Sequence, residues 1–212
     1  MGCRKKREKN NCSCRLYRTW YFRGIYDNGR NSLLNEIITK YDCHKASDIL
    51  NILREKVMNL LQQKGEDGEP ADGMDIALCI IDCKRMELEY SGAYNPLYLV
   101  SNGQLSVLKG DRMPIGIHLN FQQPFSDYRI QVKPKDMIFL FSDGYADQFG
   151  GPEGKKFRYK NFQDLLVSIA EKSVAEQKEI LHRSFLEWKG KEEQVDDVLI
   201  WGLHVNHEKH KK

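Results

Sequence analysis

The stretch Lys135-Asp136-Met137-Ile138-Phe139-Leu140-Phe141-Ser142-Asp143-Gly144-Tyr145-Ala146-Asp147 decides how this sequence is interpreted. Residues 137–141 form a short, wholly apolar run, which is typical of a strand buried on both faces. The run ends at Ser142, Asp143 and Gly144. A carboxylate placed where a buried strand meets a glycine turn is held rigidly and lets a ligand approach closely. An aspartate that closes the strand in an Asx-turn explains the same residues, and this stretch alone leaves both interpretations open.

A second carboxylate pair precedes another apolar run near the other end of the chain. The sequence there reads Gln194-Val195-Asp196-Asp197-Val198-Leu199-Ile200-Trp201-Gly202-Leu203. Aspartates at the ends of strands far apart in sequence are how β-rich folds gather oxygen ligands for Mg²⁺ or Mn²⁺. Asp143 and Asp196 are therefore the candidate metal ligands.

The two motifs together resemble those of the SpoIIE-type bacterial serine phosphatases of the PPM, or type 2C, superfamily. In that family the chain typically reads F-S-D-G near the middle of the domain and D-D before the last strand. The segments Asp72–Leu78, Gly92–Tyr98 and Asp147–Gly151 fit as well, and the resemblance runs from about Asn31 to Val205. Sheets with segregated helix pairs indicate an α+β layered domain. The resemblance implies a β-sandwich with helices packed on both outer faces, here as an incomplete PPM-type fold.

The resemblance also implies a function in signal transduction. Relatives hydrolyse a phosphoserine or phosphothreonine monoester on a regulatory protein, such as an anti-sigma factor antagonist. Two Mn²⁺ or Mg²⁺ ions lower the pKa of a bridging water and clamp the phosphoryl group, so no catalytic side chain beyond this water is needed. By resemblance, Asp143 and Asp196 each ligate one side of this cluster.

Further positions are supporting candidates for the same cluster. Gly144 lies beside the first ligand, and Asp197 is expected to point away or to support its neighbour. Asp75 and Asp147 are weaker candidates, and Asp147 is more simply explained as a loop or cap residue.

Residues 1–30 show no sustained apolar period and do not look like part of any domain. In the family, the residues before a segment like Asn31–Glu36 read approximately A-D-C-T-G-H-G-x-x-G-A-F-M-x-x-x-G, the first metal-binding motif. Permitted codons for Cys14–Arg30, read one nucleotide later, give A-D-C-T-G-H-G-I-S-G-A-F-M-T-M-V-G. Part of the shifted sequence does not depend on codon choice. Trp20 has a single codon, so reading Trp20-Tyr21 one nucleotide later must give Gly. We interpret residues up to about Arg30 as an out-of-frame translation of that motif, with the frame restored at Asn31.

This interpretation predicts an impaired enzyme. Asp27 is the only aspartate before Asn31, and the family motif places no ligand there. Two carboxylates leave a pair of divalent cations under-compensated, so phosphatase activity should be weak or absent. The lost segment should also supply central strands, which would leave their neighbours with exposed edges. Two alternatives stay open, a catalytically inactive pseudophosphatase that binds a protein partner or forms a homodimer, and a non-functional gene remnant that folds poorly.

Composition sets further limits. The 212 residues suit one domain, placed at residues 31–205 and followed by a polar tail at 206–212. The net charge of +3 comes from basic runs at both ends, which argues against a nucleic-acid partner because that needs a basic stripe on a folded surface. No apolar run reaches membrane-spanning length, and a signal peptide is lacking, so no membrane association is expected. Cys79 and Cys83 are expected to be buried thiols in a reducing, cytoplasmic compartment.

The apolar periodicity predicts the order of elements. Helices are expected near residues 33–38 and 47–61, with Ser47 as the N-cap of the second. Strands are expected at 74–81, 87–90, 97–100, 104–108, 125–132 and 137–141, with Asn102-Gly103 as a hairpin turn. Helices at 161–172 and 174–188 and a strand at 198–205 complete the chain, and residues 150–155 are expected to form a loop.

Overall fold

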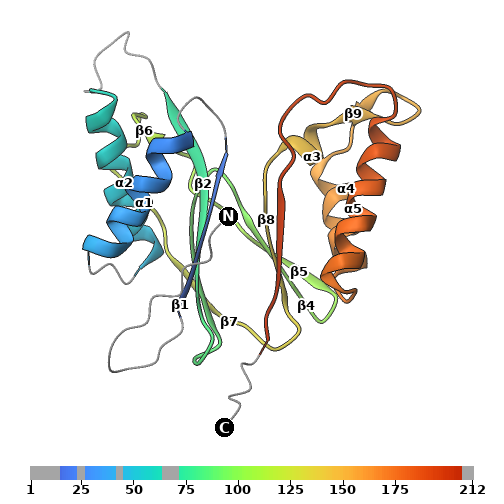
Figure 1. Cartoon of the computed structure of the whole chain (residues 1–212), viewed down its shortest axis with the longest axis horizontal. Coiled ribbons are helices and arrows are strands. Elements are labelled where there is room, and N and C mark those ends of the chain that lie inside the picture. The colour runs from blue at the N-terminus through green and yellow to red at the C-terminus, as the bar shows by residue number, and fades with distance from the viewer. Residues whose placement is uncertain (1–14, 23–26, 42–44, 64–71, 207–212) are drawn as a thin grey trace. The chain divides into compact units, whose positions relative to one another are not determined.

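The computed structural model describes residues 15–22, 27–41, 45–63 and 72–206 (Figure 1). The chain divides into two compact units, each with its own sheet, helices and core. The first unit contains the described residues up to Leu97 together with Leu108–Val132, and the second contains Tyr98–Val107 and Lys133–Asn206. The fold is α+β, as predicted. The predicted β-sandwich would require the sheets of the two units to pack on each other, and this packing stays a prediction.

The sheet of the first unit is built around strand β2, Gly73–Asp82. The strand order is β1 (Arg15–Phe22), β2, β3 (Glu87–Ala93) and β7 (Tyr128–Gln131), and the short strand β6 (Ile115–Gly116) pairs with the beginning of β2. Every pairing in this sheet is antiparallel. The predictions of strands at residues 74–81 and 87–90 are confirmed, and the two strands are paired.

Strand β1 corrects one expectation. Loss of the first motif was expected to leave neighbouring strands with exposed edges, but Arg15–Phe22 pair with β2 throughout their length, with Arg15 opposite Asp82 and Phe22 opposite Asp75. Main-chain groups make these hydrogen bonds, so pairing needs strand-forming residues and not a particular motif. The sequence R-L-Y-R-T-W-Y-F is rich in aromatic residues, which favour strands. Residues 15–22 therefore have regular structure although their sequence does not fit the family pattern.

Two helices cover one side of this sheet, α1 (Asp27–Lys40) and α2 (Ala46–Leu60) (Figure 1). Helix α2 packs against β2, β3 and β6. Its apolar stripe of Ile49, Leu50, Leu53 and Val57 is buried in a core with Met74, Ile76, Leu78 and Ile80 of β2. The 3.6-residue period of the sequence thus places the apolar face of α2 on the sheet, as expected.

The start of α2 differs from the prediction. Its N-cap is Lys45, which makes no side-chain capping bond, and Ser47 is buried inside the first turn. The assignment of Ser47 as N-cap is therefore wrong. The Ala46 N–H donates instead to Oε1 of Glu89 at 2.6 Å, so a carboxylate from strand β3 serves the helix terminus.

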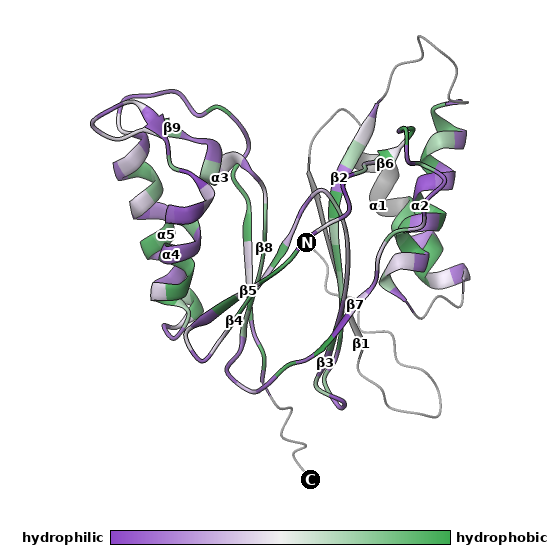
Figure 2. Ribbon diagram, turned by 180° about the vertical axis from the view of Figure 1, so that it is seen from behind, coloured by the Kyte–Doolittle hydropathy of each residue, from purple (hydrophilic) through white to green (hydrophobic). Residues whose placement is uncertain are grey.

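The sheet of the second unit has the order β11 (Ile200–His204), β8 (Met137–Phe141), β4 (Leu97–Ser101) and β5 (Gln104–Leu108). All residues of β8 are buried, as its apolar sequence predicted. Helices α4 (Tyr159–Ile169) and α5 (Val174–Lys189) lie beside this sheet (Figure 1). Apolar and polar residues alternate around both helices (Figure 2). Their apolar sides enclose an aromatic core that includes Phe141, Tyr145 and Phe162.

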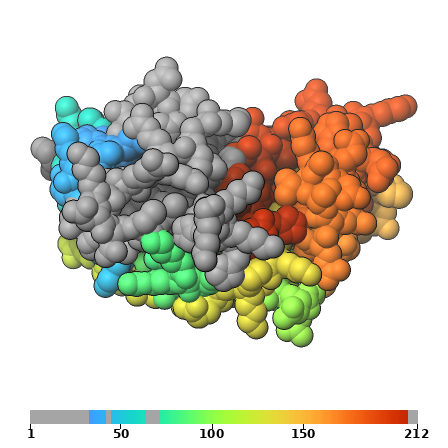
Figure 3. Space-filling model, turned by 60° about the horizontal axis from the view of Figure 1, so that its bottom comes forward, coloured from blue at the N-terminus to red at the C-terminus, as the bar shows by residue number. Residues whose placement is uncertain are grey.

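Two hairpins complete the second unit. Asn102 and Gly103 both have positive φ, 50° and 71°, as the predicted tight turn between β4 and β5 requires, and this hairpin stands out at the surface in light green (Figure 3). Residues 150–155 were predicted to form a loop. The two ends of this segment instead pair with each other as the short strands β9 (Phe149–Gly150) and β10 (Lys155–Lys156). None of the helices in the described parts of the chain is long and apolar enough to cross a membrane.

Candidate metal centre

The first loop of the candidate centre follows strand β8. Ser142 is buried, and its N–H donates to the carbonyl oxygen of Leu199 at 2.9 Å. Asp143 is exposed and stands at the N-cap of the short helix α3 (Gly144–Asp147), whose Asp147 N–H donates to the Asp143 carbonyl oxygen at 2.9 Å. The Asp143 side chain makes no capping hydrogen bond to this helix. Its carboxylate therefore does not serve the turn as a helix cap.

The second loop, residues 193–199, carries Asp196 and leads into β11. Oδ1 of Asp196 accepts the N–H of Asp197 at 2.8 Å, and its carbonyl oxygen accepts Nε2 of Gln194 at 2.8 Å. Asp196 is half-buried, whereas Asp197 is exposed. The chain bends at Asp196, and both bonds are local to this bend.

The two loops are joined by Ser142 and pressed together at Gly144. The Ser142 hydroxyl donates to the carbonyl oxygen of Asp197 at 2.9 Å and accepts the N–H of Leu199 at 2.9 Å. A Cβ atom at Gly144 would lie 2.5 Å from the carbonyl oxygen of Asp197, which is closer than real Cβ contacts come. Glycine is thus needed at 144 for this approach. The structure brings together the loops that carry Asp143 and Asp196, while metal binding by their carboxylates stays a prediction.

The weaker candidates lie in different settings. Asp75 is on strand β2 of the first unit, opposite Phe22 of β1. Asp147 ends α3 and pairs with Nζ of Lys156 on β10 at 3.1 Å. The Lys156 ammonium also lies 5.8 Å from the centroid of the Phe149 ring. An ion pair to the β9–β10 hairpin agrees with the simpler interpretation of Asp147 as a cap or loop residue.

The residues in the described parts of the chain do not fit a complete two-cation centre. In residues 15–22, 27–41, 45–63 and 72–206, no group of three or more His, Cys, Asp or Glu side chains is arranged to hold a metal ion. Asp143 and Asp196 offer carboxylate oxygens of the kind that Mg²⁺ and Mn²⁺ prefer. Their two negative charges are too few to compensate two divalent cations.

Two residues of this region were not singled out from the sequence. Ser142 is part of the motif that identified the loop, but nothing local shows that its hydroxyl joins the second loop. Gln148, which directly follows α3, is fully buried and bonds to the Glu193 carbonyl oxygen and the Val195 N–H. A lone glutamine after a short helix has no periodic signal, so only the tertiary structure reveals this contact.

Comparisons with known proteins agree with this description. The family model of Stage II sporulation protein E (SpoIIE) matches residues 31–206. A comparison with curated protein sequences gave no match.

Three solved structures are similar in fold. The SiaA-PP2C domain of Pseudomonas aeruginosa has a TM-score of 0.77 and 24% sequence identity, with 93% of this chain and 78% of that chain covered. The PP2C phosphatase domain of SpoIIE from Bacillus subtilis, with a fragment of its regulatory domain, has a TM-score of 0.65 and 17% identity over 91% of this chain and 54% of that chain. RsbX in complex with magnesium has a TM-score of 0.57 and 13% identity over 92% and 83%.

The extent of the family match decides the assignment. Identities of this size to solved structures indicate the fold alone, but the family model covers most of the sequence and includes both loops of the candidate centre. The chain therefore belongs to the SpoIIE family of metal-dependent PP2C-type protein serine phosphatases.

Proposed function

We propose that this chain is a SpoIIE-type phosphatase domain whose natural reaction is hydrolysis of a phosphoserine or phosphothreonine monoester on a regulatory protein, and whose own turnover is weak or absent. The observation that carries the proposal is the contact between the Ser142–Gly144 turn and the loop around Asp196. Ser142 and Gly144 fit the main chain of Asp197 closely, and both carboxylates stand on this pair of loops. Main-chain contact of this kind holds candidate ligands on a rigid frame.

The small number of carboxylates at the candidate centre supports weak phosphatase activity. A phosphate monoester hydrolyses very slowly unless a catalyst supplies a nucleophile and neutralises the phosphoryl oxygens. In the family, divalent cations supply both. Asp143 and Asp196 represent part of such a centre, and the family motif that would add the next carboxylate does not occur in residues 1–30.

A shift of reading frame explains the missing part. The family match begins at Asn31, which agrees with the position where we place the return to the correct frame. The nucleotide sequence across Cys14–Arg30 tests this directly. Codons that shift by one nucleotide into A-D-C-T-G-H-G are expected, and codons that cannot do so would refute the explanation.

Phosphate release by the full chain tests the proposed impairment. With a phosphoserine peptide and Mn²⁺, we expect a rate close to that of the buffer. Typical enzymes turn over at about 1–1000 per second, and a rate in this range would contradict the proposal. Asp143→Asn is the matched control, because it should change nothing in a chain that is already inactive.

A second candidate function is a protein-binding pseudophosphatase. It is favoured over a poorly folding remnant by the buried apolar cores of both units and by the pairing of β1 with β2. The partner would be a phosphorylated regulatory protein, such as an anti-sigma factor antagonist, or a second copy of this chain. Retention of the phosphorylated but not the unphosphorylated protein on the immobilised chain would support binding. A chain without a cooperative thermal transition in far-UV dichroism would instead support the remnant.

A further inference from the structure

Gln148 is a buried amide next to the candidate centre. It directly follows helix α3, which begins beside Asp143, and its side chain has no exposed surface. A buried amide without hydrogen bonds would be costly, so its partners indicate why a glutamine is tolerated there.

The partners of this amide lie on the loop of Asp196. Nε2 of Gln148 donates to the carbonyl oxygen of Glu193 at 2.8 Å and to that of Phe149 at 3.0 Å. Oε1 accepts the N–H of Val195 at 3.3 Å. The side chain therefore binds the main chain just before Asp196, whereas Ser142 binds the main chain just after it.

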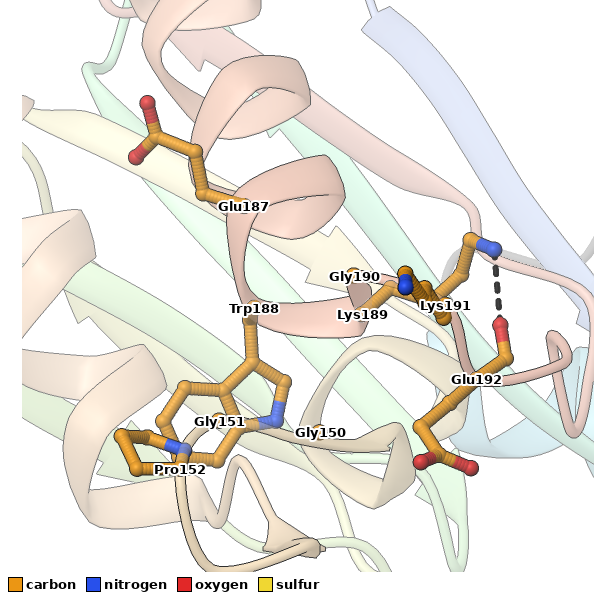
Figure 4. Close-up of a pocket in the computed structure, with 9 residues that line it drawn as sticks. All are labelled: Gly150, Gly151, Pro152, Glu187, Trp188, Lys189, Gly190, Lys191 and Glu192. Carbon is orange, nitrogen blue, oxygen red and sulfur yellow. Dashed lines mark hydrogen bonds between the residues drawn. The ribbon is translucent and has the colours of Figure 1, made fainter.

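Gln148 is itself held by the end of helix α5. Its carbonyl oxygen accepts Nε1–H of Trp188 at 3.0 Å and the N–H of Phe157 at 2.9 Å. The Gly151 N–H donates to the carbonyl oxygen of Trp188 at 2.8 Å, and the indole lies against Gly151 (Figure 4). A cavity of about 320 Å³ lies at this junction and is lined by residues 150–152 and 187–192. The main chain of Gln148 is thus anchored to α5, and its side-chain amide binds the acidic loop.

We propose that Gln148 is a positioning residue that fixes Asp196 in place before any metal or substrate binds. Ser142 and Gln148 bracket Asp196, so the loop has little freedom between two buried attachments. This inference rests on the proposed function in one respect, which is that Asp196 is a metal ligand. Groups that orient a ligand in this way contribute to metal affinity without touching the metal.

The test compares two buried glutamines in the full-length chain. Gln148→Met keeps the size of the side chain and removes its hydrogen bonds. Gln177→Met is the matched control, because Gln177 is also buried in the second unit but donates to the carbonyl oxygens of Ala170 and Lys172. Both variants lose buried amide bonds, and only the first loses bonds to the acidic loop.

Amide hydrogen exchange of Val195 and Asp197 is the first measurement. In Gln148→Met we expect the exchange rate at these amides to rise by about tenfold or more. The loop opens more easily in this variant because no hydrogen bonds to residue 148 have to be broken. Gln177→Met should leave them unchanged. Equal rates in Gln148→Met and the parent chain would overturn the proposal, and so would an equal rise in both variants.

Binding of Mn²⁺ is the second measurement and needs no turnover. Mn²⁺ added to the isotopically labelled chain should broaden the amide signals of Asp143 and Asp196, and the midpoint should rise about tenfold in Gln148→Met and not in Gln177→Met. An unchanged midpoint in Gln148→Met would contradict a positioning role. Absence of broadening in the parent chain would refute the metal-ligand assignment of the proposed function, while the exchange measurement would still decide whether Gln148 fixes the loop.

Discussion

Ser142 joins the two loops of the candidate centre through one buried hydroxyl. The hydroxyl donates to the carbonyl oxygen of Asp197 and accepts the N–H of Leu199, both at 2.9 Å. A buried donor or acceptor that loses its partner costs about 1–3 kcal/mol. The Ser142 hydroxyl therefore stabilises the contact between the two loops whether or not a metal is bound.

Replacement of this hydroxyl should loosen the site. In Ser142→Ala, the Leu199 N–H and the Asp197 carbonyl oxygen lose a partner, and the free energy of unfolding should fall by about 1–3 kcal/mol in urea denaturation. Ser168→Ala is the control, since the exposed Ser168 hydroxyl on α4 donates only to the Leu165 carbonyl oxygen. Ser168→Ala should lower the free energy of unfolding by less than about 0.5 kcal/mol. Equal losses in the two variants would show that Ser142 is not a special junction.

Gly144 shows how close packing restricts a single position. In Gly144→Ala the new methyl group would meet the main chain of Asp197, at 2.5 Å from its carbonyl oxygen. A backbone atom cannot move aside as a flexible side chain can, so we expect a loss of about 1–3 kcal/mol in the same denaturation experiment. A stability equal to that of the parent chain would mean that the loops can separate at little cost.

The N-terminus of helix α2 depends on carboxylates from other elements. Glu89 accepts the Ala46 N–H and pairs with Nη2 of Arg129 at 3.1 Å. Partial burial of the carboxyl group and, to a smaller extent, repulsion from Glu89 raise the pKa of Asp127 to about 6. Arg129 and Lys45 oppose this rise without cancelling it. The ionised form of Asp127 is thus disfavoured by the fold.

This raised pKa gives stability a pH dependence with a definite sign. Between the ordinary aspartate pKa of about 4 and the folded value near 6, the folded chain holds a proton that the unfolded chain has lost, so stability falls as pH rises through this range. Asp127→Asn should remove the fall, because the amide does not ionise. Melting temperatures at pH 5 and pH 8 measure it, with Asp164→Asn as an exposed control on α4. An identical pH profile in Asp127→Asn and the parent chain would contradict the assignment.

The order of elements could be predicted from the sequence, but their junctions could not. The apolar run of β8 and the Asn102-Gly103 turn determine local structure from local residues, and both are confirmed. The N-cap of α2 was misassigned because Glu89, its actual partner, is 43 residues away. The pairs β9–β10 and β2–β6 were missed because strands of two residues leave no periodic signal.

The candidate site follows the same division. The carboxylates of Asp143 and Asp196 stand at strand ends, which the sequence shows directly, and their loops are in contact. The roles of Ser142 and Gln148 depend on which main-chain groups lie opposite them, and no local pattern encodes that. Groups suited to metal chemistry could therefore be predicted from the sequence, but the groups that contact their loops could not.

In the whole molecule, the family match and the ordered strands do not begin at the same residue. Residues 31–206 match the SpoIIE family model, whereas residues 15–22 pair with β2 although they do not fit the family pattern. Backbone pairing is tolerant of sequence, but metal ligation requires particular side chains. The pairing of residues 15–22 with β2 therefore does not test the proposed loss of metal-binding carboxylates.

Restoration of the first motif would show whether its loss is what impairs this phosphatase domain. Lys9–Arg30 would be replaced by K-I-I-V-V-A-D-C-T-G-H-G-I-S-G-A-F-M-T-M-V-G, the sequence obtained by reading permitted codons one nucleotide later, and Mn²⁺-dependent phosphate release from a phosphoserine peptide would be measured. The control is the same replacement with Arg15 retained in place of the new aspartate. We predict a rate at least about 100-fold above that of the original chain, and a rate near background for the control. A restored chain that folds cooperatively, and yet releases phosphate no faster than the original, would show that the first motif is not the missing part of the metal centre.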